Sequence, residues 1–151
     1  MEKKQLDLQM QKLNSEYSKK MNEIARKKED LNAAKQISLF NADEEFYAKR
    51  NDLLKRIGDL RQRRAELFDG DPQRAQLELD KLDLQNQITV LRDDNEQRKR
   101  DITHKAYAQR RDLDEECRKL SEWLQAEKVK LMEQYVDNNH LNINYLLNVE
   151  Q

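Results

Sequence analysis

The sequence predicts an all-α protein, built as one long antiparallel two-helix coiled-coil hairpin with a short C-terminal tail. Charged residues make up 39% of the 151 residues and hydrophobic residues 36%, so the chain has apolar material for a narrow core only. Two glycines and one proline leave few turns, and good helix formers dominate the remainder. Apolar residues recur at helical spacing nearly throughout, which separates this chain from a disordered one of similar polarity.

The strongest stop and start signal is the segment 69–72, Asp-Gly-Asp-Pro. Gly70 suits the end of a helix, because glycine adopts positive φ without a steric cost. Asp71 can cap the next helix, and Pro72 is tolerated in the first turn, where no backbone donor is needed. One helix is therefore predicted to end here and another to begin.

We expect one hairpin domain over residues 1–136 and a docking tail over 137–151. The arms of the hairpin span residues 3–68 and 72–136, and its tip spans 69–71. The arms are nearly equal in length, as an antiparallel hairpin requires, and each would be about 100 Å long at a rise of 1.5 Å per residue.

A fold-back between Gly70 and Asp71 pairs residues whose numbers sum to 141, and this register can be tested on the sequence. Apolar residues meet in the pairs Leu6 with Tyr135, Met10 with Leu131, Tyr17 with Leu124, Met21 with Leu120, Ile24 with Cys117, Leu39 with Ile102, Leu53 with Ile88 and Ile57 with Leu84. Where a basic residue faces an apolar one, as Arg50 faces Leu91, its stem can pack while its charge reaches water. The register favours a thin coiled coil.

The first arm alternates by four and three residues along the seam, as a coiled coil requires, at Phe46, Arg50, Leu53, Ile57, Leu60, Arg64 and Leu67.

The sequence leaves alternatives open at two positions of the hairpin. Residues 41–45 have the composition of a helix N-terminus, so the first arm is either continuous or kinked or broken at residues 40–43. Asn95 lies on the seam of the second arm, where it is either buried, fixing the register, or turned to solvent beside Phe46.

The sequence carries no catalytic or metal-binding constellation. His104 and His140 lie far apart, and the only Asp-x-x-His spacing, Asp101 to His104, occurs once, whereas a metal site in a helical bundle needs several such contributions. A glycine-rich phosphate loop and a nucleophile elbow are also missing. We therefore expect a protein that is not an enzyme and that has no cofactor and no metal.

Charge argues against a nucleic-acid protein. The formal net charge is −1, whereas binding to a phosphate backbone normally needs a clear basic excess. Basic clusters at residues 61–64, 98–100 and 110–111 lie among acidic residues such as Asp59 and Asp94. This mixture favours a solvated, salt-bridged face over a nucleic-acid site.

The chain also lacks the signals that would send it into or across a membrane. No apolar run approaches the ~18 residues of a membrane span, and no apolar segment behind the N-terminus could serve as a signal peptide. The single cysteine, Cys117, excludes an intramolecular disulfide and is expected to fill the core. We expect no membrane insertion and a location in the cytoplasm or inside a particle assembled there.

A second apolar stripe lies beside the seam in the half of the hairpin near the turn. Tyr47, Leu54 and Phe68 recur at multiples of seven, and Leu79 and Leu82 also fall off the seam. Because a two-helix hairpin buries one narrow seam, apolar residues outside it indicate a protein partner or self-association. The alternative is a broad seam with partly exposed residues.

The tail departs from the helical pattern. Its apolar residues Leu141, Ile143, Tyr145, Leu147 and Val149 fall at every second place, which is typical of a strand. Since the sequence contains no second strand, such a tail would pair with another chain by β-augmentation. A short helix or a frayed terminus is the alternative.

In size, charge and hairpin form, the chain resembles the coiled-coil stalk and chaperone proteins of flagellar or type III export, and the small helical scaffolding or internal proteins of phage particles. The resemblance covers the hairpin and rests on architecture alone. Three hypotheses follow: a structural or adaptor coiled-coil subunit of a larger assembly such as a virion, an export-type chaperone or stalk that binds partners transiently, and a nucleic-acid-binding coiled coil.

Overall fold

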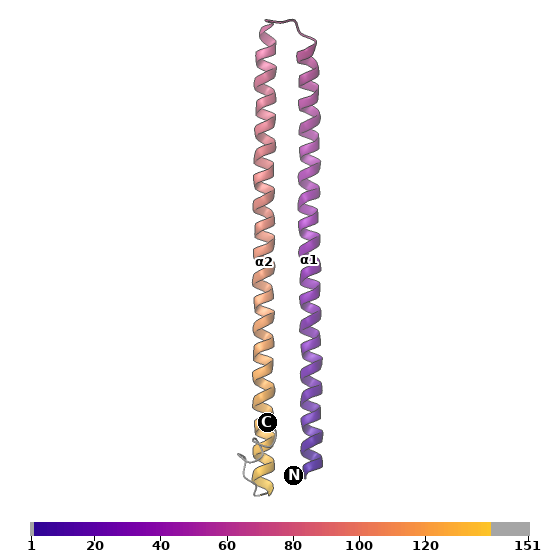
Figure 1. The fold of residues 1–151 in the computed structure, drawn as a ribbon, viewed down its shortest axis with the longest axis vertical. Helices are drawn as coiled ribbons and strands as arrows, with labels where there is room; N and C mark the ends of the chain where they lie inside the picture. The colour runs from indigo at the N-terminus through magenta and orange to yellow at the C-terminus, as the bar shows by residue number, and fades with distance from the viewer. Residues whose placement is uncertain (1, 140–151) are drawn as a thin grey trace. The chain divides into compact units, whose positions relative to one another are not determined.

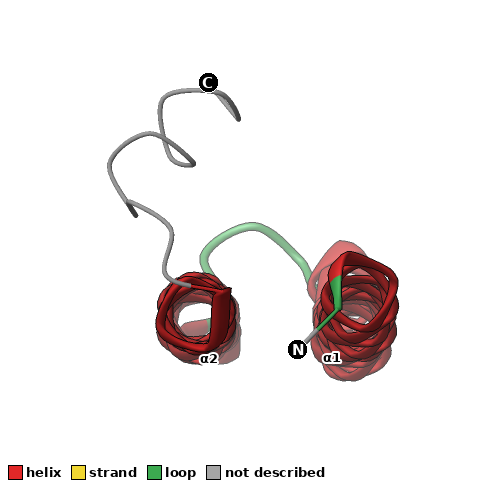
Figure 2. Cartoon of the chain, turned by 90° about the horizontal axis from the view of Figure 1, so that it is seen from below, coloured by secondary structure: helices red, strands yellow, loops and turns green. Residues whose placement is uncertain are grey.

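The computed structural model describes residues 2–139. They form two helices, α1 from Lys3–Ala65 and α2 from Pro72–Asn139, and no strand. Figure 2, in which helices are red and loops green, shows the two helices and the loop that joins them. This arrangement confirms the predicted all-α helical hairpin. The strand or short helix predicted for the tail lies outside the described residues beyond Asn139.

The helix ends differ from the predicted ones by three residues each. We predicted an end of the first arm at 68, but α1 ends at Ala65, and α2 continues to Asn139 instead of ending at 136. Beyond Ala65 the amide of Leu67 donates to the carbonyl of Arg64, 3.2 Å, in the tighter i to i+3 pattern of a closing turn. Arg74 of α2 donates to the carbonyl of Leu67, 3.0 Å, which removes that carbonyl from any further helical bond.

The predicted turn chemistry is observed at Gly70 and Asp71. Gly70 has φ 87°, and the amide of Asp71 donates to the carbonyl of Phe68, 3.2 Å, which closes a turn with glycine at its left-handed position. The Asp71 carboxylate accepts from the amide of Gln73, 2.9 Å, and so caps α2, whose first residue is Pro72. Both the stop and the start are therefore encoded locally.

Helix α1 passes through residues 40–43 without interruption, so the alternative of a break there is wrong. Ala42 is 1% exposed and Asp43 is hydrogen-bonded to Asn95 of α2, 3.0 Å. The side chain that could have capped a new helix at this point instead binds the neighbouring helix, and a continuous α1 keeps Ala42 in the interior.

The described chain divides into two compact units. The turn unit comprises residues 32–107, and the terminal unit comprises 2–31 together with 108–139. Within each unit a stretch of α1 lies antiparallel beside a stretch of α2 (Figure 1).

The turn unit has a contiguous apolar core. Leu53, Ile57 and Leu84 are buried in contact with one another, and the half-buried Leu60, Ile88 and Leu91 pack against them. All six are predicted seam positions. The alternation of four and three residues therefore produces the core that it predicts.

The terminal unit has buried apolar residues on both helices and polar contacts between them. Leu6, Ile24 and Met132 are buried. The hydroxyls of Tyr17 and Ser121 lie 3.2 Å apart, and Lys28 forms an ion pair with Asp114 at 2.6 Å. These two pairs have number sums of 138 and 142, within three of the predicted 141.

Candidate protein interaction surface

A polar network joins α1 to α2 beside the core of the turn unit. Asn95, 8% exposed, donates from Nδ2 to Oδ1 of Asp43 at 3.0 Å, and the ammonium of Lys99 lies 3.3 Å from the same oxygen. These two donors hold the pKa of Asp43 below its ordinary value. Arg98 pairs with Glu45 and likewise lowers the pKa of that carboxyl. Asn95 is thus the buried residue of the two alternatives, and its partner is a carboxylate on the other helix.

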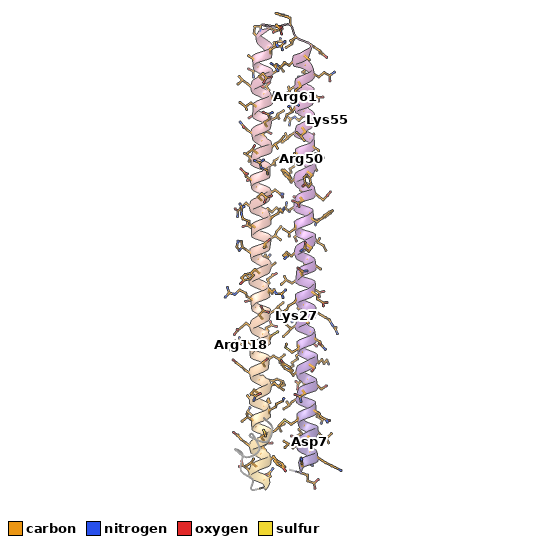
Figure 3. The ribbon with its side chains drawn as sticks, viewed as in Figure 1. Asp7, Lys27, Arg50, Lys55, Arg61 and Arg118 are labelled. Atoms are coloured by element: carbon orange, nitrogen blue, oxygen red, sulfur yellow. The ribbon has the colours of Figure 1, made fainter. Side chains whose placement is uncertain are left out.

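Arg50 shows how the seam accommodates a basic residue. Its guanidinium lies 4.8 Å from the ring centre of Tyr47 and 5.9 Å from that of Phe46, and Nη2 donates to Oδ1 of Asn51 at 3.3 Å (Figure 3). The stem of Arg50 is half-buried while its charge rests on two aromatic faces. An arginine on the seam therefore orders the ring of Tyr47 on the surface beside it.

Several residues of the basic clusters are paired with carboxylates. Arg64 lies 2.7 Å from Glu78, and Arg98 and Lys99 bind Glu45 and Asp43. Arg118, labelled in Figure 3, pairs with two glutamates of its own helix, which raises its pKa. The local charge on these helices is mixed, as the sequence predicts.

The apolar residues predicted for a stripe on the first arm are exposed, but Phe68 lies in the loop beyond α1, so it does not continue the helical spacing of Tyr47 and Leu54. Tyr47, Leu54 and Phe68 have 45%, 47% and 71% of their surface accessible. Phe40 is also exposed and continues the same spacing of seven residues, while Ile37 lies one turn before it. Sequence analysis missed both, although counting seven residues back from Tyr47 would have found Phe40.

The α2 residues predicted for the surface, Leu79 and Leu82, are exposed as well. Val90 and Tyr107 are further exposed apolar residues of α2 that the sequence analysis did not select. Tyr107 lies four heptads after Leu79, so spacing would have found it, whereas Val90 shares no multiple of seven with Leu79 or Leu82 and only the packing of the two helices could reveal it.

A shallow groove marks a different face of the turn unit. It is lined by Ala48, Lys49, Asp52, Leu53, Asp83, Asn86, Gln87, Val90 and Leu91. Tyr47, Leu54 and Leu82 do not line it. The groove and the α1 stripe therefore open on different faces of the pair of helices.

The remaining predicted contact residues lie in the tail and are outside the described residues: Leu141, Ile143, Tyr145, Leu147 and Val149. Within residues 2–139, no group of three or more His, Cys, Asp or Glu side chains is arranged to hold a metal ion. Neither described helix combines the length and the apolar character needed to cross a lipid bilayer. The thiol of Cys117 is free and half-buried.

No protein-family model, curated protein or solved structure matches the chain. The function is therefore inferred from the residues and geometry of the chain itself.

Proposed function

We propose that this chain is a structural or adaptor coiled-coil subunit of a larger protein assembly and that it acts by binding proteins. The observation that supports the proposal is a set of large apolar side chains exposed on the turn unit: Ile37, Phe40, Tyr47, Leu54, Phe68, Leu79, Leu82, Val90 and Tyr107. Aromatic and large aliphatic side chains that lose water at an interface supply most of its binding energy.

These side chains lie outside the core that holds the two helices together. The core of the turn unit consists of Leu53, Ile57 and Leu84 with three half-buried neighbours, and none of the exposed residues belongs to it. Large apolar side chains that recur along one exposed face of a helix, as Phe40, Tyr47 and Leu54 do on α1, are a feature of interaction sites. Binding a partner would remove it from water, which the packing of two helices alone does not.

We place the assembly in the cytoplasm or in a particle built there, because the one cysteine of the chain, Cys117, is unpaired. A scaffolding or internal component of a virion is the form of this proposal that best matches the size and charge of the hairpin. An export-type chaperone or stalk would use the same surface for short-lived complexes.

The proposal is tested by purifying the affinity-tagged full chain from its own cells at moderate salt and measuring the stoichiometry of the proteins that remain bound through gel filtration. A stable complex of fixed stoichiometry is expected. Leu54→Asp or Leu79→Asp should abolish it, because either change places a charge in the apolar surface. Gln62→Asp, an equal change in charge at an exposed polar site of α1, is the matched control and should leave the complex intact.

Other outcomes of this purification contradict the proposal in different ways. Loss of the complex after nuclease treatment would indicate the nucleic-acid-binding coiled coil. Partners that appear only after chemical crosslinking would indicate a transient export-type chaperone. If the Leu54→Asp and Leu79→Asp variants still captured the partner proteins, the binding surface would lie outside the turn unit.

The tail supplies a second expected contact. Deleting residues 141–151 should abolish partner capture and leave the melting temperature of the helices unchanged, if the tail binds as an added strand. The double variant Ile143→Asp with Leu147→Asp should do the same without shortening the chain, whereas Asn142→Ser with Asn144→Ser should have little effect. A lower melting temperature with intact capture would make the tail an intramolecular cap.

A further inference from the structure

Helix α1 carries a second coiled-coil seam within the turn unit. Its residues alternate by three and four and are all exposed: Ile37, Phe40, Glu44, Tyr47, Asn51, Leu54, Gly58, Arg61 and Ala65. The seam that packs against α2 runs beside it through Leu53 and Ile57. A 3-4 spacing aligns residues along one face of a helix, so α1 presents an exposed face of this kind, on which Arg50 contacts Tyr47 and Asn51.

Gly58 is the residue of this second seam that the monomer leaves unexplained. It lies in the interior of α1 with ordinary helical geometry, and a Cβ placed on it would meet nothing within 4 Å. Glycine inside a helix costs about 1 kcal/mol relative to alanine. The chain accepts this cost without any packing benefit of its own. Close approach by a second helix, next to Leu54 one turn away, would explain the absence of a side chain.

Residues of the second seam lie at matching distances along the chain on either side of Leu54. Tyr47 and Arg61 lie seven residues on either side of it, and Asn51 and Gly58 lie three and four residues on either side. If two copies of α1 cross antiparallel at Leu54, Tyr47 of each copy meets Arg61 of the other. Asn51 of each copy likewise meets Gly58 of the other. Arg61 has no ionic partner within residues 2–139, so its guanidinium is available for an aromatic ring.

Helix α2 has a matching order about Gln85. Glu78 and Arg92 lie seven residues on either side of it, and Leu82 and Thr89 lie three and four residues on either side. In the same antiparallel crossing, Glu78 of one copy meets Arg92 of the other, and Leu82 meets Thr89. The charges are therefore complementary in both directions, because a two-fold axis repeats each contact.

The α1 and α2 faces lie on one side of the turn unit. Arg50 and Arg64 are fourteen residues, or two heptads, apart on α1 and so point the same way. Arg50 rests on Tyr47, and Arg64 binds Glu78. Tyr47 and Glu78 therefore share a face, and neither lines the groove that runs along the other face.

The two centres of symmetry also lie at the same height. Contacts between the helices in this unit join residues whose numbers sum to between 138 and 143, which places Leu54 level with residues 84–89 of α2. Gln85 falls in this range. One two-fold axis can thus pass through both Leu54 and Gln85.

We propose that the occupant of this face is a second copy of the chain, bound antiparallel about a two-fold axis at the level of Leu54 and Gln85. The proposal rests on the proposed function, since it names the first partner of the apolar surface. At this level the chain is complementary to itself, through Tyr47 with Arg61 and Glu78 with Arg92, which a helix from an unrelated protein would not require. Leu79, Val90 and the groove remain free for other subunits.

Lys55 makes the least favourable contact in this dimer, because the two-fold axis brings like charges together there. Lys55, labelled in Figure 3, follows Leu54 in the sequence, so a two-fold axis at Leu54 would bring the two copies of Lys55 near each other. Asp52 and Asp59 lie one turn on either side of Lys55 on its own helix and offset part of this repulsion.

Sedimentation equilibrium of the full chain tests the dimer directly. The chain should sediment as a dimer at micromolar concentration, and Leu54→Asp should raise the dissociation constant at least about 100-fold, with the circular dichroism of the helices unchanged. Val90→Asp, the matched change on the groove face, should leave the dissociation constant unaltered. A wild-type chain that stays monomeric, or a dimer that Val90→Asp dissociates instead, overturns the proposal.

Gly58→Ala separates a role in the dimer from a role in the monomer. Alanine should raise the melting temperature of the dilute monomer, because it is the better helix former, and should weaken the dimer about tenfold, because its methyl group meets the approaching helix. A variant that stabilises both monomer and dimer would show that no helix approaches Gly58.

Disulfide trapping tests the orientation in a Cys117→Ser background. Leu54→Cys should crosslink to itself on oxidation, since the axis brings the two Cα atoms within about 7 Å, and Val90→Cys should not. Crosslinking of Leu54→Cys chains to Gln85→Cys chains instead would indicate that α1 of one copy lies over α2 of the other. That result would overturn the antiparallel axis.

The two proposals fail in distinguishable ways. A monomeric chain that still holds another protein through Leu54 or Leu79 would overturn the dimer and leave the adaptor function standing. A dimer that forms the expected crosslinks but retains no other protein would overturn the adaptor function and leave the dimer standing.

Discussion

The two units of the chain use the same pattern of residues to different extents. The turn unit packs Leu53, Ile57 and Leu84 into one contiguous core, and the terminal unit buries Leu6, Ile24 and Met132 along a seam of half-buried residues. Of the ten large hydrophobic side chains exposed within residues 2–139, nine belong to the turn unit and one, Leu8, to the terminal unit. The unit that contains the Leu53, Ile57 and Leu84 core thus also carries nearly all of the exposed large apolar side chains.

This difference indicates that the exposed apolar side chains of the turn unit do not compensate for a weak core in that unit. In a thin coiled coil the seam takes two of every seven residues, and the strict repeat in the turn unit already provides them. Additional apolar residues beside such a seam do not stabilise the pair. They fit a binding surface on the unit that is rigid enough to present it.

The largest expected effect comes from placing a charge in the core of the turn unit. Ile57→Asp buries an unpaired carboxylate against Leu84 and should destabilise this unit by roughly 3–5 kcal/mol, with a large loss of helical circular dichroism. Ile37→Asp, on the exposed surface of the same helix, is the control and should change the signal little. If both variants lost the same amount of helical circular dichroism, Ile57 would not differ from the exposed Ile37 in its contribution to the fold.

Truncating one buried residue in each unit compares their packing. Leu84→Ala should cost about 2–3 kcal/mol, because it leaves a cavity in the cluster with Leu53 and Ile57, and Met132→Ala about half as much if the surroundings of Met132 relax into the space left. Urea unfolding monitored by circular dichroism measures both. A larger cost for Met132→Ala would place the stronger core in the terminal unit.

The polar network should make the turn unit sensitive to acid. A carboxyl whose folded pKa is depressed contributes stability above its unfolded pKa, about 3.9 for aspartate, and loses it as the pH falls through the folded pKa. Asn95→Ala removes the principal donor to Asp43 and should lower the melting temperature by roughly 5 °C near neutral pH.

Melting curves of wild type and Asn95→Ala from about pH 7 to about pH 3 test this coupling. The difference between the two melting temperatures should narrow at the acid end, where Asp43 becomes protonated. A difference that stays constant across the range would mean that Asn95 acts through its shape rather than through the carboxylate of Asp43.

The smallest effect is expected at a surface contact of the terminal unit. Tyr17→Phe removes a hydroxyl that lies 3.2 Å from that of Ser121 in an exposed position, and should cost about 0.5 kcal/mol or less because water replaces the lost bond. Thermal unfolding of this variant beside Ser121→Ala measures the change. A cost above about 1 kcal/mol would show that this unit relies on polar contacts where the turn unit relies on apolar ones.

The sequence by itself determined the elements and their direction. Gly70, Asp71 and Pro72 encode the end of one helix and the start of the next within three consecutive residues. The repeat through Leu53, Ile57 and Leu84 encodes the core. Such signals can be recognised because capping and periodicity act between residues that are neighbours along the chain.

The tertiary structure alone decided the contacts between the helices. Asn95 binds Asp43 across a separation of 52 residues, and that contact resolves both whether Asn95 is buried and whether α1 breaks near residue 43. The exposure of Val90 was likewise decided by the packing of the two helices, because its spacing from the other exposed residues of α2 does not predict it. Spacing along one helix predicts which side chains share a face, but whether that face is covered depends on the position of the other helix, which is set by register and packing over long stretches of chain.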